Sequence, residues 1–279
     1  MRLSLLTCGA ALLFASAASA QSPVQLGLFA GIGQYEGDLK SGLFRGRVDP
    51  AIGLTGSYDI SSRFALRAGL TFSALQASDA SNNKDELRLR NFSFKTKLTD
   101  FSLVGQYSFF NIDQTRWTPY VFAGIAVFHF DPYTYDASGQ KVYLQPLGTE
   151  GQGLPQNPGR DLYKKTQLAI PFGGGITYAL TERWQLGIEA GIRKTFTDYI
   201  DDVSGTYADQ ADLLAGRGSE AVSVAYRRDE VDPGAAYPQK GAMRGNDKFK
   251  DVYYFTGLHL QFRLGSGGGK GKYGCPSVQ

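Results

Sequence analysis

Cysteine and histidine are both scarce in this chain, which has two of each among 279 residues. Cys8 lies in an apolar N-terminal stretch, and if that stretch is removed only Cys275 remains, which excludes an intramolecular disulfide. Cys275 is then either a free thiol or one half of an intermolecular bridge. Neither His129 nor His259 has a partner at the spacing of a metal site, so we expect each to be a packed or lumen-facing side chain.

Long apolar runs and an excess of one charge are also missing. After residue 20, Gly, Pro or a charge interrupts every run that approaches the roughly 18–20 residues of a membrane-spanning helix, which excludes a helical membrane protein. Lysine and arginine total 29 against 26 for aspartate and glutamate, so nothing indicates nucleic-acid binding. Abundant instead are hydrophobic residues (42%), glycine (35 residues) and aromatic residues (13%), a mixture that excludes intrinsic disorder and is typical of β-rich proteins.

The first 20 residues have the three parts of a secretory signal peptide. Arg2 is followed by an apolar stretch over residues 3–14, and small residues lead to Ala-Ser-Ala at 18–20. Cleavage after Ala20 would leave Gln21 as the first residue of the mature chain. A buried hydrophobic helix is the alternative, and lipid attachment at Cys8 is rejected because too short an apolar region precedes it.

Alternation of apolar residues with polar or small residues, with a period of two, is the strongest pattern in the rest of the chain. In residues 63–73, Leu66 and Leu70 point one way while Arg67 and Thr71 point the other, and residues 183–193 and 252–264 repeat the pattern. The same pattern predicts eight strands, at about 24–37, 51–60, 63–77, 91–110, 118–130, 167–180, 183–196 and 250–264.

The connections between these strands alternate in length. Short turns follow the second, fourth and sixth strands, and long loops follow the odd strands. The turns are at 59–62, 111–117 and 181–182, and the loops at about 38–50, 78–90, 131–166 and 197–249. The sequence therefore predicts an all-β fold, an eight-stranded antiparallel transmembrane β-barrel in the bacterial outer membrane, with short periplasmic turns and long extracellular loops among the outer-membrane lipids.

Alternation alone does not decide which face of the barrel is inside. A soluble lipocalin-type barrel keeps its apolar face inward, whereas surrounding lipid forces Arg67, Glu189 and Arg193 into the lumen, where they can pair. The signal peptide, the unequal loops and aromatic residues near strand ends favour the membrane. Those aromatic residues are Phe64, Trp117, Tyr120, Tyr178, Trp184 and Phe262.

Eight strands leave room only for side chains, so we predict a plugged lumen without an open pore. Small residues would leave space for long neighbours; the candidates are Gly173, Gly175, Thr177, Gly187 and Gly191. Along the chain we expect a signal peptide at 1–20, the outer-membrane β-barrel at 21–264, and a flexible Gly/Lys-rich tail at 265–279 on the periplasmic side.

Motifs that carry chemistry are few. Asp198, Asp201 and Asp202 put three carboxylates within five residues, and hard cations prefer such oxygen-rich clusters. The spacing does not match an EF-hand loop, however, and acidic residues near a strand end more often begin a turn or pair with arginine.

The glycine-rich run at 147–153 lacks the Lys-Ser/Thr of a phosphate loop and is interpreted as a tight loop that needs positive φ. With no G-x-S-x-G elbow, we expect no enzymatic activity and no cofactor.

Five runs, spread over nearly the whole mature chain, resemble the PorG-like family of outer-membrane proteins. They are 90–94 (RNFSF), 118–124 (TPYVFAG), 145–153 (QPLGTEGQG), 193–204 (RKTFTDYIDDVS), and 243–246 (MRGN) followed by 251–257 (DVYYFTG). The resemblance implies a structural component of the type IX secretion system, which moves folded cargo across the outer membrane. It also implies that the barrel is not the conduit but anchors a periplasmic ring made of a lipoprotein and a soluble partner.

Most of these runs lie at strand ends and loop bases on the long-loop side, where paired charges would fold the loops over the barrel. The structural charge network that we expect comprises Arg67, Glu150, Glu189, Arg193, Asp198, Asp201, Asp202 and Arg244. For function, we expect a barrel that binds a periplasmic lipoprotein through its short turns. An adhesin-like barrel that binds surfaces through its extracellular loops is the alternative, and a small enzyme at the rim that depends on His129 or His259 is a third reading.

Overall fold

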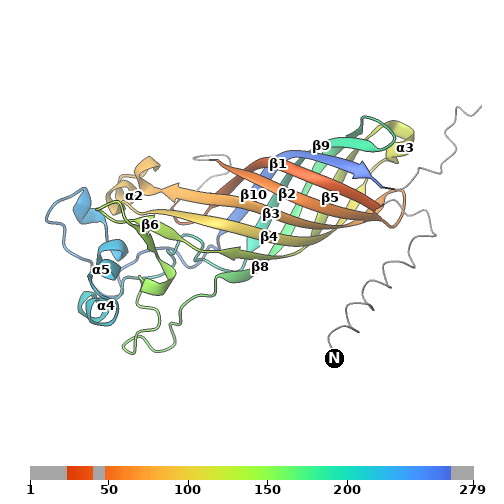
Figure 1. Ribbon diagram of the computed structural model, residues 1–279. Helices are drawn as coiled ribbons and strands as arrows, with labels where there is room; N and C mark the ends of the chain where they lie inside the picture. The colour runs from red at the N-terminus through yellow and green to blue at the C-terminus, as the bar shows by residue number, and fades with distance from the viewer. Residues whose placement is uncertain (1–23, 40–47, 265–279) are drawn as a thin grey trace, which may run out of the picture.

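The computed structural model describes residues 24–39 and 48–264. The expected signal peptide, the expected tail with Cys275, and part of the first long loop lie outside the described residues. Eight long strands form the body of the described part (Figure 1). They are β1 (Val24–Glu36), β2 (Asp49–Asp59), β3 (Phe64–Ser78), β4 (Ser93–Ser108), β5 (Trp117–Phe130), β8 (Thr166–Ala179), β9 (Trp184–Thr195) and β10 (Val252–Arg263).

The eight long strands close into a barrel. Each pairs antiparallel with the next along the chain, and β1 pairs with β10, from Gln25 opposite Arg263 to Glu36 opposite Val252. The pairing of β3 with β4 completes the ring. Closure leaves no exposed sheet edge, and lipid requires this because it offers no hydrogen bonds to unpaired backbone groups.

The strand boundaries agree with those that alternation predicts to within two residues at each end. The long loop at 131–166 contains an unexpected small hairpin of β6 (Tyr133–Tyr135) and β7 (Lys141–Tyr143), which extends the sheet from β4. The Asp136 side chain accepts hydrogen bonds from the backbone N–H groups of Ser138 and Gln140 and so closes the hairpin turn.

The outer face of the barrel is apolar, and the inner face is polar, small or aromatic. Leu54, Ile125 and Ile188 lie exposed on the outside, whereas Arg67 and Glu189 are buried inside. A soluble barrel would reverse this arrangement. The molecule is therefore an outer-membrane β-barrel with periplasmic short turns and extracellular long loops. Among the described residues, no helix has the length and apolar character to cross a membrane.

Aromatic side chains gather at the periplasmic rim, as expected at a lipid interface. Phe64, Trp117, Tyr178 and Trp184 are exposed there, and the Trp184 ring lies 4.8 Å from that of Phe262. The expectation for Tyr120 is wrong, because its side chain is buried in the lumen. Strand β5 is apolar on both faces, with Val121 outside and Phe122 inside, so hydrophobic alternation does not separate the two faces.

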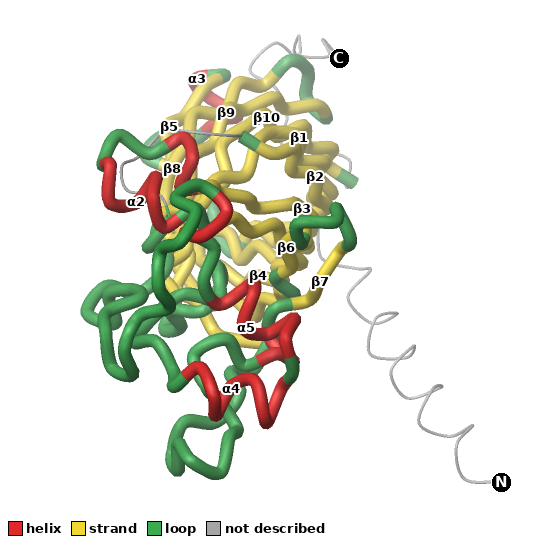
Figure 2. The backbone as a smooth tube through the Cα atoms, turned by 90° about the vertical axis from the view of Figure 1, so that its left-hand side faces the viewer, coloured by secondary structure: helices red, strands yellow, loops and turns green. Residues whose placement is uncertain are grey.

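The long loops fold over the extracellular end of the barrel as a compact layer (Figure 2). We call residues 79–92, 131–165 and 196–251 the extracellular cap. Its short helices are η2 (Asp79–Ser81), α2 (Asp85–Arg90), η3 (Gln145–Leu147), α4 (Gln210–Arg217), α5 (Ser219–Ala225) and η4 (Arg228–Glu230). The main apolar core lies where the cap meets the strand ends, and it joins Phe94, Phe128 and Tyr253 of the barrel to Ile200 and Tyr163 of the cap.

Candidate functional site

A charged cluster closes the middle of the lumen. Nη1 of Arg67 donates to Oε2 of Glu189 at 2.6 Å, and the Tyr120 hydroxyl donates to the same oxygen at 2.6 Å. The Arg67 guanidinium also lies 4.9 Å from the centroid of the Phe122 ring. Both buried charges therefore have the partners that a low-dielectric site requires.

Glycines on β8 and β9 provide the space for the aromatic side chains of this cluster. A Cβ atom at Gly175 would lie 2.7 Å from Cζ of Tyr120, and one at Gly191 would lie 2.6 Å from Cζ of Phe122. The cavity that remains beside Arg67 is about 30 Å³, which matches a single water molecule. The lumen is thus filled as the strand count predicts, and the surfaces open to partners lie at the two ends.

In the cap, the carboxylate of Glu150 joins loops that are distant in sequence. Its Oε1 accepts hydrogen bonds from the backbone N–H groups of Ser204 (2.9 Å) and Gly205 (3.0 Å) and from Nη1 of Arg244 (3.2 Å). The flanking Gly151 has a φ of 79°, so the run at 147–153 is the tight turn that its glycines predict. Glu150 and Arg244 are both buried, and each neutralises the other.

Asp202 lies on the opposite side of Arg244. Its carboxylate accepts hydrogen bonds from the hydroxyls of Thr149 and Tyr163, the latter at 2.7 Å, and lies 3.8 Å from Nη2 of Arg244. Burial raises the pKa of Asp202 to about 6, although Arg244 and the two hydroxyls favour its charged form. The cap therefore holds a carboxyl group that titrates close to neutral pH.

The Tyr35 hydroxyl lies between two further carboxyl groups of the cap. It is 2.5 Å from Oδ2 of Asp201 and 2.9 Å from Oδ1 of Asp251, and all three side chains are buried. Burial raises the pKa of both Asp201 and Asp251 well above the usual range. The phenol proton serves only one acceptor at a time, and burial together with the mutual repulsion of the two carboxylates favours the protonated form of one of them.

Asp198 occupies a separate position, where its carboxylate accepts a hydrogen bond from the Ser204 hydroxyl at 2.7 Å. Burial raises the pKa of Asp198 to about 7. Asp198, Asp201 and Asp202 thus bond to different groups. In the described ranges, no three His, Cys, Asp or Glu side chains are placed to hold a metal ion.

The expected charge network is divided in the structure. Glu150, Asp202 and Arg244 meet in the cap, beside Asp198 and Asp201. The ion pair between Arg67 and Glu189 forms its own cluster in the lumen. A third contact lies between these two, where Nε of Arg193 is 3.8 Å from Asp100.

Sequence reasoning missed the contribution of the first two extracellular loops to this network. Nε and Nη2 of Arg90 donate to the two carboxylate oxygens of Asp79 at 2.7 and 2.9 Å, and Nη1 donates to the Arg244 carbonyl at 2.8 Å. The guanidinium groups of Arg90 and Arg244 both lie over the Phe92 ring, 5.0 and 4.6 Å from its centroid. The run at 90–94 was the available signal, because it contains both Arg90 and Phe92.

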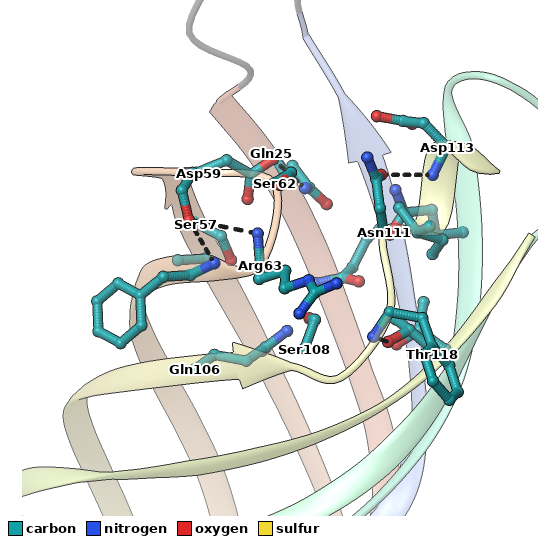
Figure 3. A pocket seen from close by; sticks show the side chains of 18 of the residues that line it. Gln25, Ser57, Asp59, Ser62, Arg63, Gln106, Ser108, Asn111, Asp113 and Thr118 are labelled. Carbon is teal, nitrogen blue, oxygen red and sulfur yellow. Dashed lines mark hydrogen bonds between the residues drawn. The ribbon is translucent and has the colours of Figure 1, made fainter. Parts of the chain in front are cut away.

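A polar cavity of about 310 Å³ opens at the periplasmic end of the barrel (Figure 3). It lies between the turn that joins β2 to β3 and the connection from β4 to β5, which carries α3 (Ile112–Thr115). The Ser61 hydroxyl accepts from the backbone N–H of Phe64 at 3.0 Å, and Oδ1 of Asn111 accepts from that of Asp113 at 3.0 Å, so both connections are ordered by side-chain caps. We call this cavity the periplasmic mouth.

Amides and two guanidinium groups dominate the walls of the periplasmic mouth. Register brings them together, because Gln185 lies opposite Gln261 and Gln25 lies opposite Arg263 in the ladders. The long polar side chains that line the mouth are Gln25, Arg63, Gln106, Gln185, Gln261 and Arg263. Alternation placed Arg63, Gln185, Gln261 and Arg263 on the polar face of their strands, and sequence reasoning expected a partner contact at the neighbouring turns, but it did not predict that these side chains line one cavity.

The two histidines lie in unrelated places. His259 is buried in the lumen, where Nε2 is 2.7 Å from the Thr55 hydroxyl. His129 is exposed on the outer face of β5, and its Nδ1 is 2.9 Å from the Thr166 hydroxyl. Neither histidine lines the periplasmic mouth.

Several solved outer-membrane proteins have similar folds. Neisserial surface protein A is 11% identical, with 88% of this chain and 98% of that chain covered and a TM-score of 0.41. Outer membrane protein W of E. coli is 15% identical, with 88% and 100% covered and a TM-score of 0.39. The attachment invasion locus protein of Yersinia pestis is 6% identical, with 87% and 100% covered and a TM-score of 0.40. These similarities concern the fold alone.

No curated protein matches the chain. A family described as a domain of unknown function, DUF6089, matches residues 4–146. This match covers just over half of the 279 residues, and it includes β1 to β5 together with the first two extracellular loops. The chain belongs to the DUF6089 family.

Proposed function

We propose that this protein is a structural anchor in the outer membrane that holds a periplasmic partner at its short turns. The observation that supports this proposal is the contrast between a small cavity of about 30 Å³ in the middle of the lumen and a polar cavity of about 310 Å³ at the periplasmic rim. A filled lumen supports anchoring rather than conduction. The resemblance to PorG-like proteins makes the lipoprotein of the type IX secretion ring, with its soluble partner, the assembly that we expect to be held there.

A non-enzymatic role is part of the same proposal. Catalysis at a rim would need a base and a nucleophile within hydrogen-bond reach of a shared open cavity. His259 is enclosed by lumen side chains, and His129 is on the outer face of the barrel. The open periplasmic mouth is lined by amide, hydroxyl and guanidinium groups and by two carboxylates, of which Asp59 accepts a hydrogen bond from Gln25 and Asp113 pairs with Arg263.

The test is partner recovery after changes to the two short turns that border the mouth. Replacing all of residues 59–62 and 111–117 would also disturb the fold, because Asp59 accepts a hydrogen bond from Gln25, Asn111 caps α3, and Trp117 belongs to the aromatic rim. We therefore limit the replacements to 60–62 and 112–115, with neutral turn sequences. Heat-modifiable gel migration establishes whether each variant still forms a closed barrel.

A matched control alters residues 137–139, in the exposed turn of the β6–β7 hairpin on the extracellular side. Affinity purification from cross-linked outer membranes should recover the ring lipoprotein with the parent chain and the control, and lose it with the turn variant. If the folded turn variant recovers every envelope partner that the parent recovers, the periplasmic anchor is wrong.

Surface binding through the extracellular loops is the second candidate function, and one observation favours it. A groove of about 1250 Å³ in the cap is bordered by Met243 and Phe249, whose side chains are unusually exposed, at 80% and 74%. Apolar side chains this exposed are common at contact surfaces. Under this view, Met243→Ser with Phe249→Ser would abolish adhesion to host or abiotic surfaces, whereas the anchor proposal expects adhesion to be unchanged.

A further inference from the structure

We infer that the periplasmic mouth binds a polar peptide segment that bears a carboxylate, contributed by the periplasmic partner. This inference rests on the proposed anchoring function and specifies how the barrel would hold its partner. The binding site that we infer is formed by the walls of the periplasmic mouth, inside the periplasmic end of the barrel. The short turns only border this cavity (Figure 3).

The first observation is a set of amide side chains left without partners. Gln185 and Gln261 are 5% and 6% exposed, and both line the cavity. Gln106 lines the opposite wall and points toward the opening in Figure 3. Among the described residues, none of these three amides has a hydrogen-bonding partner. Their amide atoms are not among the enclosed unpaired atoms and so face the open cavity, where these donors and acceptors are available to water or to a group that enters.

The second observation is spare positive charge. The Arg263 side chain is only 10% exposed, and its Nη1 donates to Asp113 at 2.8 Å while its buried Nε has no partner. Within the described part of the chain, the Arg63 guanidinium makes neither an ion pair nor a hydrogen bond. In Figure 3 its side chain lies at the opening beside Ser108, whose backbone N–H donates to the Arg63 carbonyl at 2.7 Å. Two guanidinium groups at one opening favour a carboxylate, which accepts paired N–H bonds.

The mouth also holds two acidic residues: Asp113 pairs with Arg263, and the charge of Arg263 favours the ionised form of Asp59. Asp59 accepts a hydrogen bond from Nε2 of Gln25 at 2.8 Å and so has its own partner. Asp113 has a side chain that is 64% exposed, and an exposed ion pair contributes little stability. A carboxylate that enters from the periplasm can therefore replace Asp113 at Arg263 with little loss.

The cavity suits a short peptide segment better than a folded surface or a large cofactor. Its volume of about 310 Å³ is at the lower limit of typical ligand sites. Glutamine amides donate and accept at once, as the backbone of an extended peptide does, so they can pair with main-chain N–H and C=O groups. The opening faces the periplasm. A short segment of a periplasmic protein can therefore enter the cavity while the rest of that protein remains outside the barrel. The chain's own residues 265–279 contain no aspartate or glutamate and so provide no acidic side chain.

The test uses the full chain purified in detergent micelles and two capped peptides, acetyl-Gly-Glu-Gly-amide and acetyl-Gly-Gln-Gly-amide. Binding is followed by amide chemical-shift changes at residues that line the mouth, such as Thr177 and Gln185. We expect the glutamate peptide to bind about 10-fold more tightly than the glutamine peptide. Equal affinities, or shifts confined to the extracellular cap, would overturn the inference.

Two single variants and one control connect the preference to the mouth. Arg63→Gln and Arg263→Gln should each remove most of the preference for glutamate, and Arg63 is exposed, so its replacement should leave the barrel intact. Arg88→Gln changes an exposed arginine of α2 at the other end and should leave the preference unchanged. If both mouth variants still prefer the glutamate peptide over the glutamine peptide, the carboxylate does not bind at these arginines.

Partner recovery separates failure of this inference from failure of the anchor. If the turn variant loses the ring lipoprotein but a chain with both Arg63→Gln and Arg263→Gln keeps it, the anchor stands and the inserted carboxylate is wrong. If the parent chain recovers no periplasmic protein while the purified barrel still prefers the glutamate peptide, the anchor fails. A chain ending at Leu264 that binds the glutamate peptide much more tightly than the parent would identify the tail as the occupant and overturn the assignment to a partner.

Discussion

The two ends of the barrel differ in how their central polar groups are paired, although Gln152, Arg217 and Tyr237 of the cap also have buried atoms without a partner among the described residues. In the extracellular cap, Glu150 and Arg244 are buried, and each makes several hydrogen bonds to other loops. At the periplasmic mouth, Gln185 and Gln261 are nearly as buried but have no partner among the described residues, and Nε of Arg263 is likewise unpaired. Both ends are rich in polar side chains, so composition alone does not distinguish them.

This difference separates groups that stabilise the fold from groups available for binding. Removing one partner of a paired buried charge leaves the other uncompensated and is costly. Replacing a polar group that has no partner costs little or even stabilises, because the folded protein never recovered the hydrogen bonds that the group made with water. The cap is therefore the structural end of the molecule, and the mouth has the character of a binding site.

The largest expected effect is that of Glu150→Ala, which removes one of the two carboxylates beside Arg244 and leaves two backbone N–H groups unpaired in the cap. We expect it to destabilise the cap by about 3–5 kcal/mol, the usual cost of breaking a buried ion pair. Hydrogen exchange of residues 197–205 should become much faster, while exchange in the barrel strands is unchanged. Glu220→Ala, an exposed glutamate on α5, is the control, and equal protection in the two variants would show that Glu150 does not hold the cap.

Overpacking the lumen should have a smaller effect. Gly175→Ala places a Cβ atom against the Tyr120 ring, at 2.7 Å from Cζ, and should destabilise the barrel by about 1–3 kcal/mol. Gly56→Ala on β2 is the control, because its Cβ would meet nothing within 4 Å. In heat-modifiable gel electrophoresis, the temperature at which the folded barrel converts to the unfolded form should fall for Gly175→Ala only. Identical conversion temperatures would argue against close packing in the lumen.

The stability of the cap should depend on pH. Burial raises the pKa of Asp198 to about 7 and that of Asp202 to about 6, compared with roughly 4 for an exposed aspartate. The folded cap therefore binds more protons than the opened cap, so this stability is fully present below about pH 4 and is lost as the pH rises through 6 to 7.

Exchange of residues 197–205, corrected for its intrinsic pH dependence, should thus show greater protection at pH 5 than at pH 8. Asp198→Asn should remove part of this difference, because its uncharged side chain resembles the protonated form. If protection in the parent chain increases from pH 5 to pH 8, the pKa values of Asp198 and Asp202 are not raised in the folded cap.

The smallest expected effect is at the mouth. Gln261→Leu should change the free energy of unfolding by less than about 1 kcal/mol, or increase it, because the amide that it removes has no partner in the described part of the chain. Titration with urea in detergent micelles measures this change. A loss comparable to that of Glu150→Ala would indicate that Gln261 is a structural residue and would remove the contrast between the two ends.

The strands could be predicted from the sequence because the pleat gives side chains a fixed period and lipid imposes opposite polarity on the two faces. Where this contrast disappears, prediction fails, as it did for Tyr120 on β5, whose inner and outer residues are both apolar. The partners of Glu150 come from loops about 50 and 90 residues away, and only the folded cap determines which arginine reaches it. The mouth was missed because Gln185 and Gln261 become neighbours only through strand register.

The most direct test of the account is photocrosslinking in intact cells from a photoactivatable residue placed at Arg63, compared with one placed at Gly139 in the extracellular hairpin turn. The account predicts one dominant adduct with a periplasmic lipoprotein from position 63 and no such adduct from position 139. If position 63 gives no protein adduct, or if both positions give the same one, the periplasmic mouth does not hold the partner.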